Sequence, residues 1–170
     1  MKKALIRLFV LSLGASLLLR GQTASTSLRS QLIGTWRLIS ATQRLADGTV
    51  RPDPQTGPKG KGYLVYTETG QVSAVVGNPE RNQWASAQAP TEKELRNAFD
   101  GLVAYCGTFE VNEVERYVIH HIEIDRVPNA TGAQRKRFCS LSGNRLTLRA
   151  APPLPADVAE WTIVWERVGK

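Results

Sequence analysis

The sequence predicts an all-β protein: an antiparallel sheet of about 8–10 strands, with one helix covering one end. Two observations lead to this fold class. Short runs that alternate apolar and polar residues recur along the chain, separated by turn residues. A helix start signal occurs at one place. So many strands in 170 residues, the size of one ordinary domain, must pack as two sheets or close into a barrel.

Residues 1–24 have the pattern of a secretory signal peptide. A basic start at Lys2 and Lys3 precedes an apolar run over 4–19 and then small polar residues. The run is shorter than the ~20 residues that span a bilayer, although an uncut membrane anchor stays open as the alternative. We therefore expect an exported chain, periplasmic or extracellular, with no stable membrane span after signal removal.

The charge of the chain depends on this leader. The whole sequence has 22 basic and 15 acidic residues and a net charge of +7. Four of the basic residues lie in the leader, so 18 against 15 remain and the net charge falls to +3. Such a balance is ordinary for a domain of this size and gives no reason to expect a nucleic-acid partner.

Two strand regions precede the helix. Residues 25–31 form a lead-in, disordered or helical, to a single domain over 32–168. The alternation in 33–45 predicts the first strand, and the Pro- and Gly-rich segment 51–62 predicts a loop. "YLVYTETGQVSAVV" predicts a hairpin, with Gly70 in its turn.

The helix is predicted over 91–105. Thr91 and Glu94 have the spacing of a capping box, and apolar residues then recur on one face up to Cys106. Gly101 is unfavourable inside a helix, so a bend or an end is expected there. Trp84, in the loop before the helix, either lines the cavity mouth with this helix as a lid or anchors the loop.

Five strands complete the domain. Four are predicted over 107–112, 116–125, 134–141 and 145–150, and "EWTIVWERV" predicts the closing strand over 160–168. The two cysteines, Cys106 and Cys139, either form a disulfide in an exported chain or are two separate small apolar side chains.

Four segments, "GTWRLISATQRLADGTV", "KGYLVYTETGQVSA", "AFDGLVAYCGTFEV" and "YVIHHIEI", resemble the bacterial lipocalin-like domain family. The resemblance is collinear from about residue 32 to "VWERV". It implies a closed up-and-down β-barrel of the calycin type with a central cavity. The helix over 91–105 is expected to cap a mouth of this barrel. The resemblance implies little about chemistry, because most such domains have no assigned activity.

Barrel closure is expected at Trp36 and Arg167. "GTW" resembles the Gly-x-Trp of true lipocalins, in which an Arg of the last strand lies across the Trp ring. The first and last strands of any barrel must also meet, and an arginine over an indole adds ~0.5–2 kcal/mol. This role is structural.

The adjacent histidines, His120 and His121, cannot share one metal or one substrate, because successive strand residues point to opposite faces. One face of this strand is mostly apolar and carries Val118, His120, Ile122 and Ile124. His121 lies on the mostly polar face that ends at Asp125. We therefore expect His120 inside the barrel and His121 in solvent.

The same counting gives a candidate ligand site. Leu141 should oppose Leu146, and Cys139 should oppose Leu148, across the turn of their hairpin. The expected ligand-contacting residues are Phe109, His120, Ile122, Arg137, Cys139 and Leu148. A buried Arg137 needs a partner, which could be Glu110, a ligand carboxylate or phenolate, or water.

The leading hypothesis is binding of a small apolar or aromatic ligand, possibly acidic, inside the barrel. One alternative is an enzyme in which His120 moves a proton and Arg137 stabilises an anion, as in a cyclase or isomerase. Another is a ligand-free envelope interaction module. No residue cluster has metal-ligand spacing, and no cofactor is expected.

Overall fold

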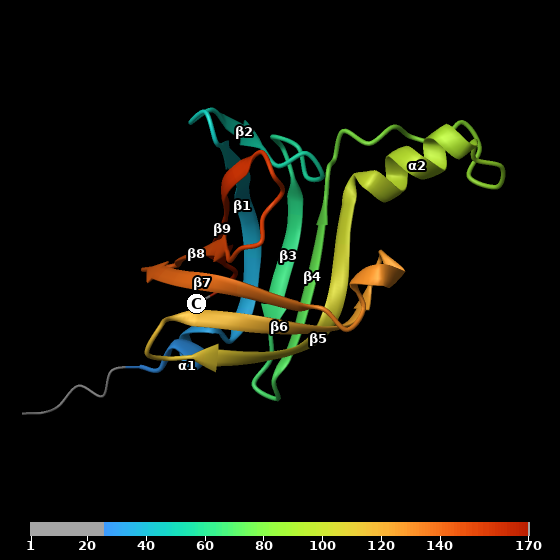
Figure 1. Cartoon of the computed structure of the whole chain (residues 1–170). Helices are drawn as coiled ribbons and strands as arrows, with labels where there is room; N and C mark the ends of the chain where they lie inside the picture. Colours follow the sequence, from blue (N-terminus) through green and yellow to red (C-terminus); the bar gives the residue numbers. More distant parts are fainter. Residues whose placement is uncertain (1–25, 170) are drawn as a thin grey trace, which may run out of the picture.

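The computed structural model describes residues 26–169, which form one antiparallel sheet of nine strands (Figure 1). The strands are β1 (Gly34–Leu45), β2 (Val50–Pro52), β3 (Lys61–Tyr66), β4 (Gln71–Gly77), β5 (Leu102–Asn112), β6 (Tyr117–Asp125), β7 (Gln134–Ser142), β8 (Arg145–Ala150) and β9 (Val158–Arg167). The helical elements are α1 (Leu28–Leu32), α2 (Glu92–Asp100) and the short 3₁₀ turn η1 (Pro128–Ala130). Within this range no helix is long and apolar enough to cross a membrane.

The sheet closes into a barrel. Each strand from β3 to β9 pairs with the next, and β1 pairs with both β3 and β9. The closing pairs run from Trp36 opposite Arg167 to Leu45 opposite Val158. The additional strand, β2, lies beside the second half of β1. A closed eight-stranded antiparallel barrel is therefore confirmed, and the alternative of two packed sheets is excluded.

The predicted hairpins are present in the expected register. Leu141 lies opposite Leu146, and Cys139 lies opposite Leu148. The tight turn between β7 and β8 fixes this pairing, as hairpin turns do. In the predicted loop over 51–62, the ends differ: β2 includes Arg51 and Pro52, and β3 begins at Lys61.

The helix is shorter than the sequence prediction. Thr91 and Glu94 form the expected capping box, but α2 ends at Asp100. Gly101 caps its C-terminus, and Leu102 already pairs with Gly77 of β4. The prediction of helix over 102–105 is wrong, because pairing with β4 outweighs the apolar periodicity that continues to Cys106.

The predicted lid over the barrel mouth is not formed by α2. The helix projects away from the barrel in Figure 1, and none of its residues is buried. Its Leu95 and Phe99 are exposed and border a shallow groove with Trp84, outside the barrel. The helix touches the barrel mouth through Arg126, whose Nη1 donates to the Phe99 carbonyl at 2.6 Å.

The opposite end of the barrel is closed by α1. Leu28 and Leu32 are completely buried there, in the same core cluster as Trp36. The carboxylate of Glu113 accepts hydrogen bonds from the backbone N–H groups of Leu28 and Arg29, at 2.6 and 3.0 Å. This end is therefore packed with side chains.

Trp36 and Arg167 fasten α1 to the barrel. The Trp36 indole N–H donates to the Leu32 carbonyl at 2.8 Å. The Arg167 guanidinium lies 4.1 Å from the centre of the Trp36 ring and donates to the carbonyls of Ile33, at 2.7 Å, and Gln31. One side chain thus joins the first strand, the last strand and the helix.

Replacing Arg167 with Ala should lower the free energy of unfolding by about 3 kcal/mol, because two charged hydrogen bonds and the contact with the indole are lost. The control is Arg37→Ala, which removes an exposed ion pair with Glu166 on the outer face. It should cost less than about 1 kcal/mol. Urea denaturation measures both, and equal losses would contradict the role of Arg167.

Candidate functional site

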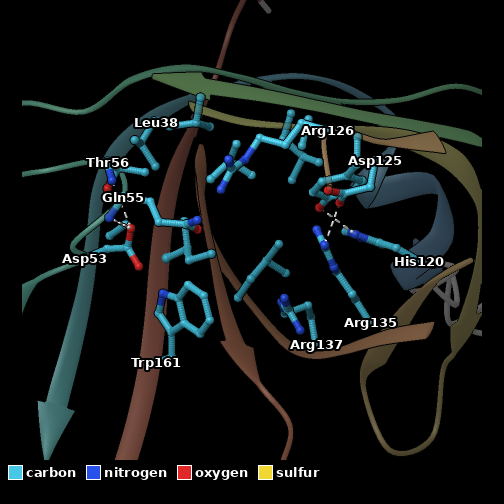
Figure 2. Close-up of a pocket in the computed structure, with 18 of the residues that line it drawn as sticks. Leu38, Asp53, Gln55, Thr56, His120, Asp125, Arg126, Arg135, Arg137 and Trp161 are labelled. Carbon is cyan, nitrogen blue, oxygen red and sulfur yellow. Dashed lines mark hydrogen bonds and ion pairs between the residues drawn. The ribbon is translucent and has the colours of Figure 1, made fainter. Parts of the chain in front are cut away.

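The barrel interior contains a cavity of about 300 Å³ at the end away from α1 (Figure 2). Its walls are mainly apolar, and small side chains such as Ala41 and Ala74 leave the space open. The apolar and aromatic lining residues are Leu38, Ala41, Leu64, Ala74, Val76, Val103, Tyr105, Val127, Ala130, Leu148, Trp161, Ile163 and Trp165. The polar lining residues are Asp53, Gln55, Thr56, His120, Asp125, Arg126, Arg135 and Arg137.

The two histidines point in opposite directions, as expected from strand alternation. His120 is 1 % exposed and borders the cavity. His121 is on the outer face, where its Nε2 lies 3.5 Å from a carboxylate oxygen of Glu110. Glu110 is therefore outside the barrel and cannot be the partner of Arg137.

The alternation of β6 reverses after Ile122. Opposite Gly107 and Cys106 of β5, the partners on β6 are Ile122 and Ile124, so one residue of β6 is skipped in a bulge. The predicted orientations of Ile124 and Asp125 are therefore wrong. Ile124 is 66 % exposed, whereas the Asp125 side chain is only 5 % exposed and borders the cavity. A bulge adds one residue, and every later side chain changes face.

Gly107 is required at this bulge. A Cβ atom there would overlap the backbone oxygen of His121 and lie 2.9 Å from the backbone nitrogen of Glu123. Only a residue without a side chain allows the two strands to approach this closely. Gly107 therefore permits the bulge in β6, after which the Asp125 side chain points into the barrel.

His120 is held between two tyrosines. Its Nε2 lies 2.7 Å from the Tyr66 hydroxyl, and its Nδ1 lies 2.9 Å from the Tyr105 hydroxyl. Burial, helped by the charges of Arg137 and Arg135, lowers the pKa of His120 to about 3. Burial also raises the pKa of Tyr66 and of Tyr105. At neutral pH the imidazole is neutral and both phenols are protonated.

Three guanidinium groups, not the single one expected, border the cavity. Arg135 is neutralised by Asp125, with Nη2 2.6 Å from the carboxylate, and lies over the Tyr105 ring. Arg126 lies over the Phe99 ring at the mouth. Arg135 and Arg137 are alternate residues of β7 and share one face, so strand alternation would have predicted that Arg135 also points into the barrel.

Arg137 is the unusual member of this group. Within residues 26–169 its side chain forms one hydrogen bond, from Nη1 to the Lys136 carbonyl at 2.9 Å, and no ion pair. Burial lowers its pKa, yet a guanidinium keeps its proton at neutral pH. The cavity wall thus carries a positive charge without a carboxylate partner.

Half of the expected ligand-contacting residues border the cavity: His120, Arg137 and Leu148. Phe109, Ile122 and Cys139 are buried but do not line it. Phe109 instead packs edge-on against Tyr66, 4.8 Å between ring centres, in the filled part of the barrel. Alternation shows which side chains point inward but not how far along the barrel the space is filled.

The opposite wall of the cavity was not predicted from the sequence. Figure 2 shows Asp53, Thr56 and Trp161 across the open space from His120 and Asp125. Alternation in "EWTIVWERV" would have placed Trp161 inside the barrel, on the same face as Trp165. The Asp53 carboxylate accepts from two backbone N–H groups of its own loop, at 3.0 Å each.

The wall also contains hydrogen-bonding groups without partners. Among the described residues these are the indole N–H groups of Trp161 and Trp165 and the hydroxyl of Thr56. All three residues border the cavity, but neighbouring atoms cover these polar atoms. Each needs a small rotation before it could meet a ligand.

The cysteines are not bonded. Cys106 is exposed on β5, and Cys139 is buried on β7, where burial raises the pKa of its thiol to about 12. In the part of the chain that the structure describes, no group of three or more His, Cys, Asp or Glu side chains could hold a metal ion.

Acid should destabilise the fold through His120. Between pH 6.5 and about 3 the unfolded chain binds a proton that the folded imidazole does not. The free energy of unfolding therefore falls with pH in this window, by up to ~1.4 kcal/mol per pH unit. His120→Gln should lose this contribution, which amounts to about 2 kcal/mol between pH 6.5 and 5.

Urea denaturation at several pH values measures this difference. His121→Gln, which removes the outward imidazole, is the matched control and should keep the contribution of His120. Parallel curves for His120→Gln and the original chain would show that His120 is not buried as a neutral side chain.

A family profile matches most of this chain. The profile of the family described as "Lipocalin-like domain" matches residues 33–168. Curated proteins give no match. Among solved structures, the crystal structure of a mutant of the fluorescent protein UnaG aligns with a TM-score of 0.38 and 10 % sequence identity, covering 82 % of this chain and 97 % of that one. The family match covers most of the sequence, and the chain belongs to the lipocalin-like domain family.

Proposed function

We propose that this protein binds a small apolar or aromatic molecule with an acidic group inside its barrel. Membership of the lipocalin-like domain family and the closed barrel support a ligand-binding role. A cavity of about 300 Å³ lies at the lower end of the range of small-molecule sites, roughly 300–1,000 Å³. The ligand is therefore small, and the apolar wall supplies most of its binding energy.

The observation that carries the acidic group is Arg137. Three guanidiniums and two carboxylates border the cavity, so its lining has an excess of positive charge. Asp125 already neutralises Arg135, whereas Arg137 forms no ion pair among the described residues. A carboxylate or phenolate of the ligand would supply the missing partner and form charge-assisted hydrogen bonds with it.

The enzyme hypothesis finds less support in the same geometry. Both ring nitrogens of His120 are occupied by Tyr66 and Tyr105, and the pKa of about 3 makes the imidazole a weak base at neutral pH. The hypothesis of a ligand-free module requires a filled barrel, and the cavity speaks against it.

Export belongs to the same proposal. The signal-peptide pattern of residues 1–24 supports it, and these residues lie outside the described part of the chain. The ligand would then be met in the periplasm or outside the cell. N-terminal sequencing of protein recovered from the periplasm and the medium tests this: a chain found in the cytosol with Met1 or Lys2 at its start would contradict it.

Titration with phenylacetate, cinnamate and decanoate tests ligand binding. We expect at least one acid to bind, and Arg137→Gln to weaken that acid at least tenfold through loss of a charged contact of about 1.5–3 kcal/mol. Arg149→Gln, on the outer face of β8, is the matched control and should leave affinity unchanged. Isothermal calorimetry measures both. Absence of binding by every acid would reject the proposal.

A further inference from the structure

His120 forms two hydrogen bonds with tyrosine hydroxyls, and their donors can be assigned by asking whether each hydroxyl proton has another acceptor. Within the described residues, the Tyr66 hydroxyl has one hydrogen-bond partner, His120 Nε2, and Tyr66 does not border the cavity. If Nε2 carried the proton, the Tyr66 hydroxyl would accept that bond, and its own buried proton would have no acceptor. That cost favours the other arrangement by about tenfold or more.

Tyr66 therefore donates to Nε2. A neutral imidazole with an accepting Nε2 carries its proton on Nδ1, which then donates to the Tyr105 oxygen, 2.9 Å away. In this series of hydrogen bonds, from Tyr66 through His120 to Tyr105, the proton of the Tyr105 hydroxyl has no acceptor. Tyr105 borders the cavity, so this proton can point to a ligand.

Among the described residues, the Tyr105 hydroxyl has one hydrogen-bond partner, His120 Nδ1. The guanidiniums of Arg135 and Arg137 contain donors only. The Asp125 carboxylate is the nearby anion, but its oxygens accept from Arg135, at 2.6 Å, and from the backbone N–H of Val127, at 2.8 Å. No hydrogen bond joins the Tyr105 hydroxyl to this carboxylate, so the Tyr105 proton is left to an acceptor in the cavity.

We propose that Tyr105 and Arg137 together hold an oxyanion of the ligand, a carboxylate or a phenolate, and that Tyr66, acting through His120, fixes Tyr105 as a hydrogen-bond donor. This inference rests on the proposed function and adds a specificity: the site takes acids in their ionised form. A primary amide of the same shape is disfavoured, because its NH₂ group would face a second donor. Tyr66 and His120 are positioning residues, and His120 does not contact the ligand.

The direction of the hydrogen bonds from Tyr66 through His120 to Tyr105 can be tested without any ligand. Nitrogen NMR of the ¹⁵N-histidine-labelled protein, assigned with His120→Gln, should show a neutral His120 with its proton on Nδ1. Tyr66→Phe removes the donor to Nε2, and the ring should then show a mixture of tautomers. A predominant Nε2–H form in the original protein would overturn the inference, whatever the protein binds.

The second test uses the tightest acid among phenylacetate, cinnamate and decanoate together with its primary amide. The original protein should prefer the acid, and Tyr105→Phe should reduce this preference about tenfold, the effect of one charge-assisted hydrogen bond. Tyr117→Phe, which alters a ring packed on Phe138 outside the barrel, is the control and should change nothing.

The outcomes separate the two proposals. Binding of the acid with an unchanged preference in Tyr105→Phe would overturn the role of Tyr105 and leave the proposed function in place. Failure of all three acids to bind would reject the proposed function and the ligand class with it.

Discussion

Closure of the sheet between β1 and β9 is the constraint on which the rest of this structure depends. Once the first and last strands are paired, each of the eight barrel strands has a barrel neighbour on both sides, and inward side chains must share an enclosed space. Arg167 reinforces this seam by contacting Trp36 and the backbone that leads from α1 into β1. The interior then divides according to side-chain size. Trp36 and Phe109 fill one end with α1, while Ala41 and Ala74 leave the other end hollow.

The layer of Tyr66, His120 and Tyr105 forms the boundary between these two ends. Tyr66 packs on the filled side, and Tyr105 faces the hollow side. His120 connects them through both ring nitrogens, so a residue that invites a catalytic interpretation instead links the packed core to the cavity wall. Burial keeps it uncharged, which leaves positive charge in this region to the arginines.

The sequence was informative where alternation and a tight turn act together, and misleading where a bulge intervenes. The pairing of Cys139 with Leu148 follows from the turn that joins β7 and β8. The orientation of Asp125 does not follow from alternation, because β6 has an extra residue at its bulge. Gly107 allows β5 to approach β6 closely at that point. A glycine within a predicted strand is a signal for such a bulge. β1 likewise shifts register between Leu38 and Ser40. The extent of the cavity depends on how side chains from different strands pack together, and alternation along one strand does not predict this.

The solitary charge of Arg137 has a consequence for the abundance of the protein. A cation partly withdrawn from water in a barrel interior, without a counter-ion, lowers the stability of the fold. An anion that settles beside it stabilises the folded state by mass action, in proportion to the logarithm of its concentration. Proteases remove unfolded chains continuously, so binding of the proposed anionic ligand would raise the steady-state amount of this protein.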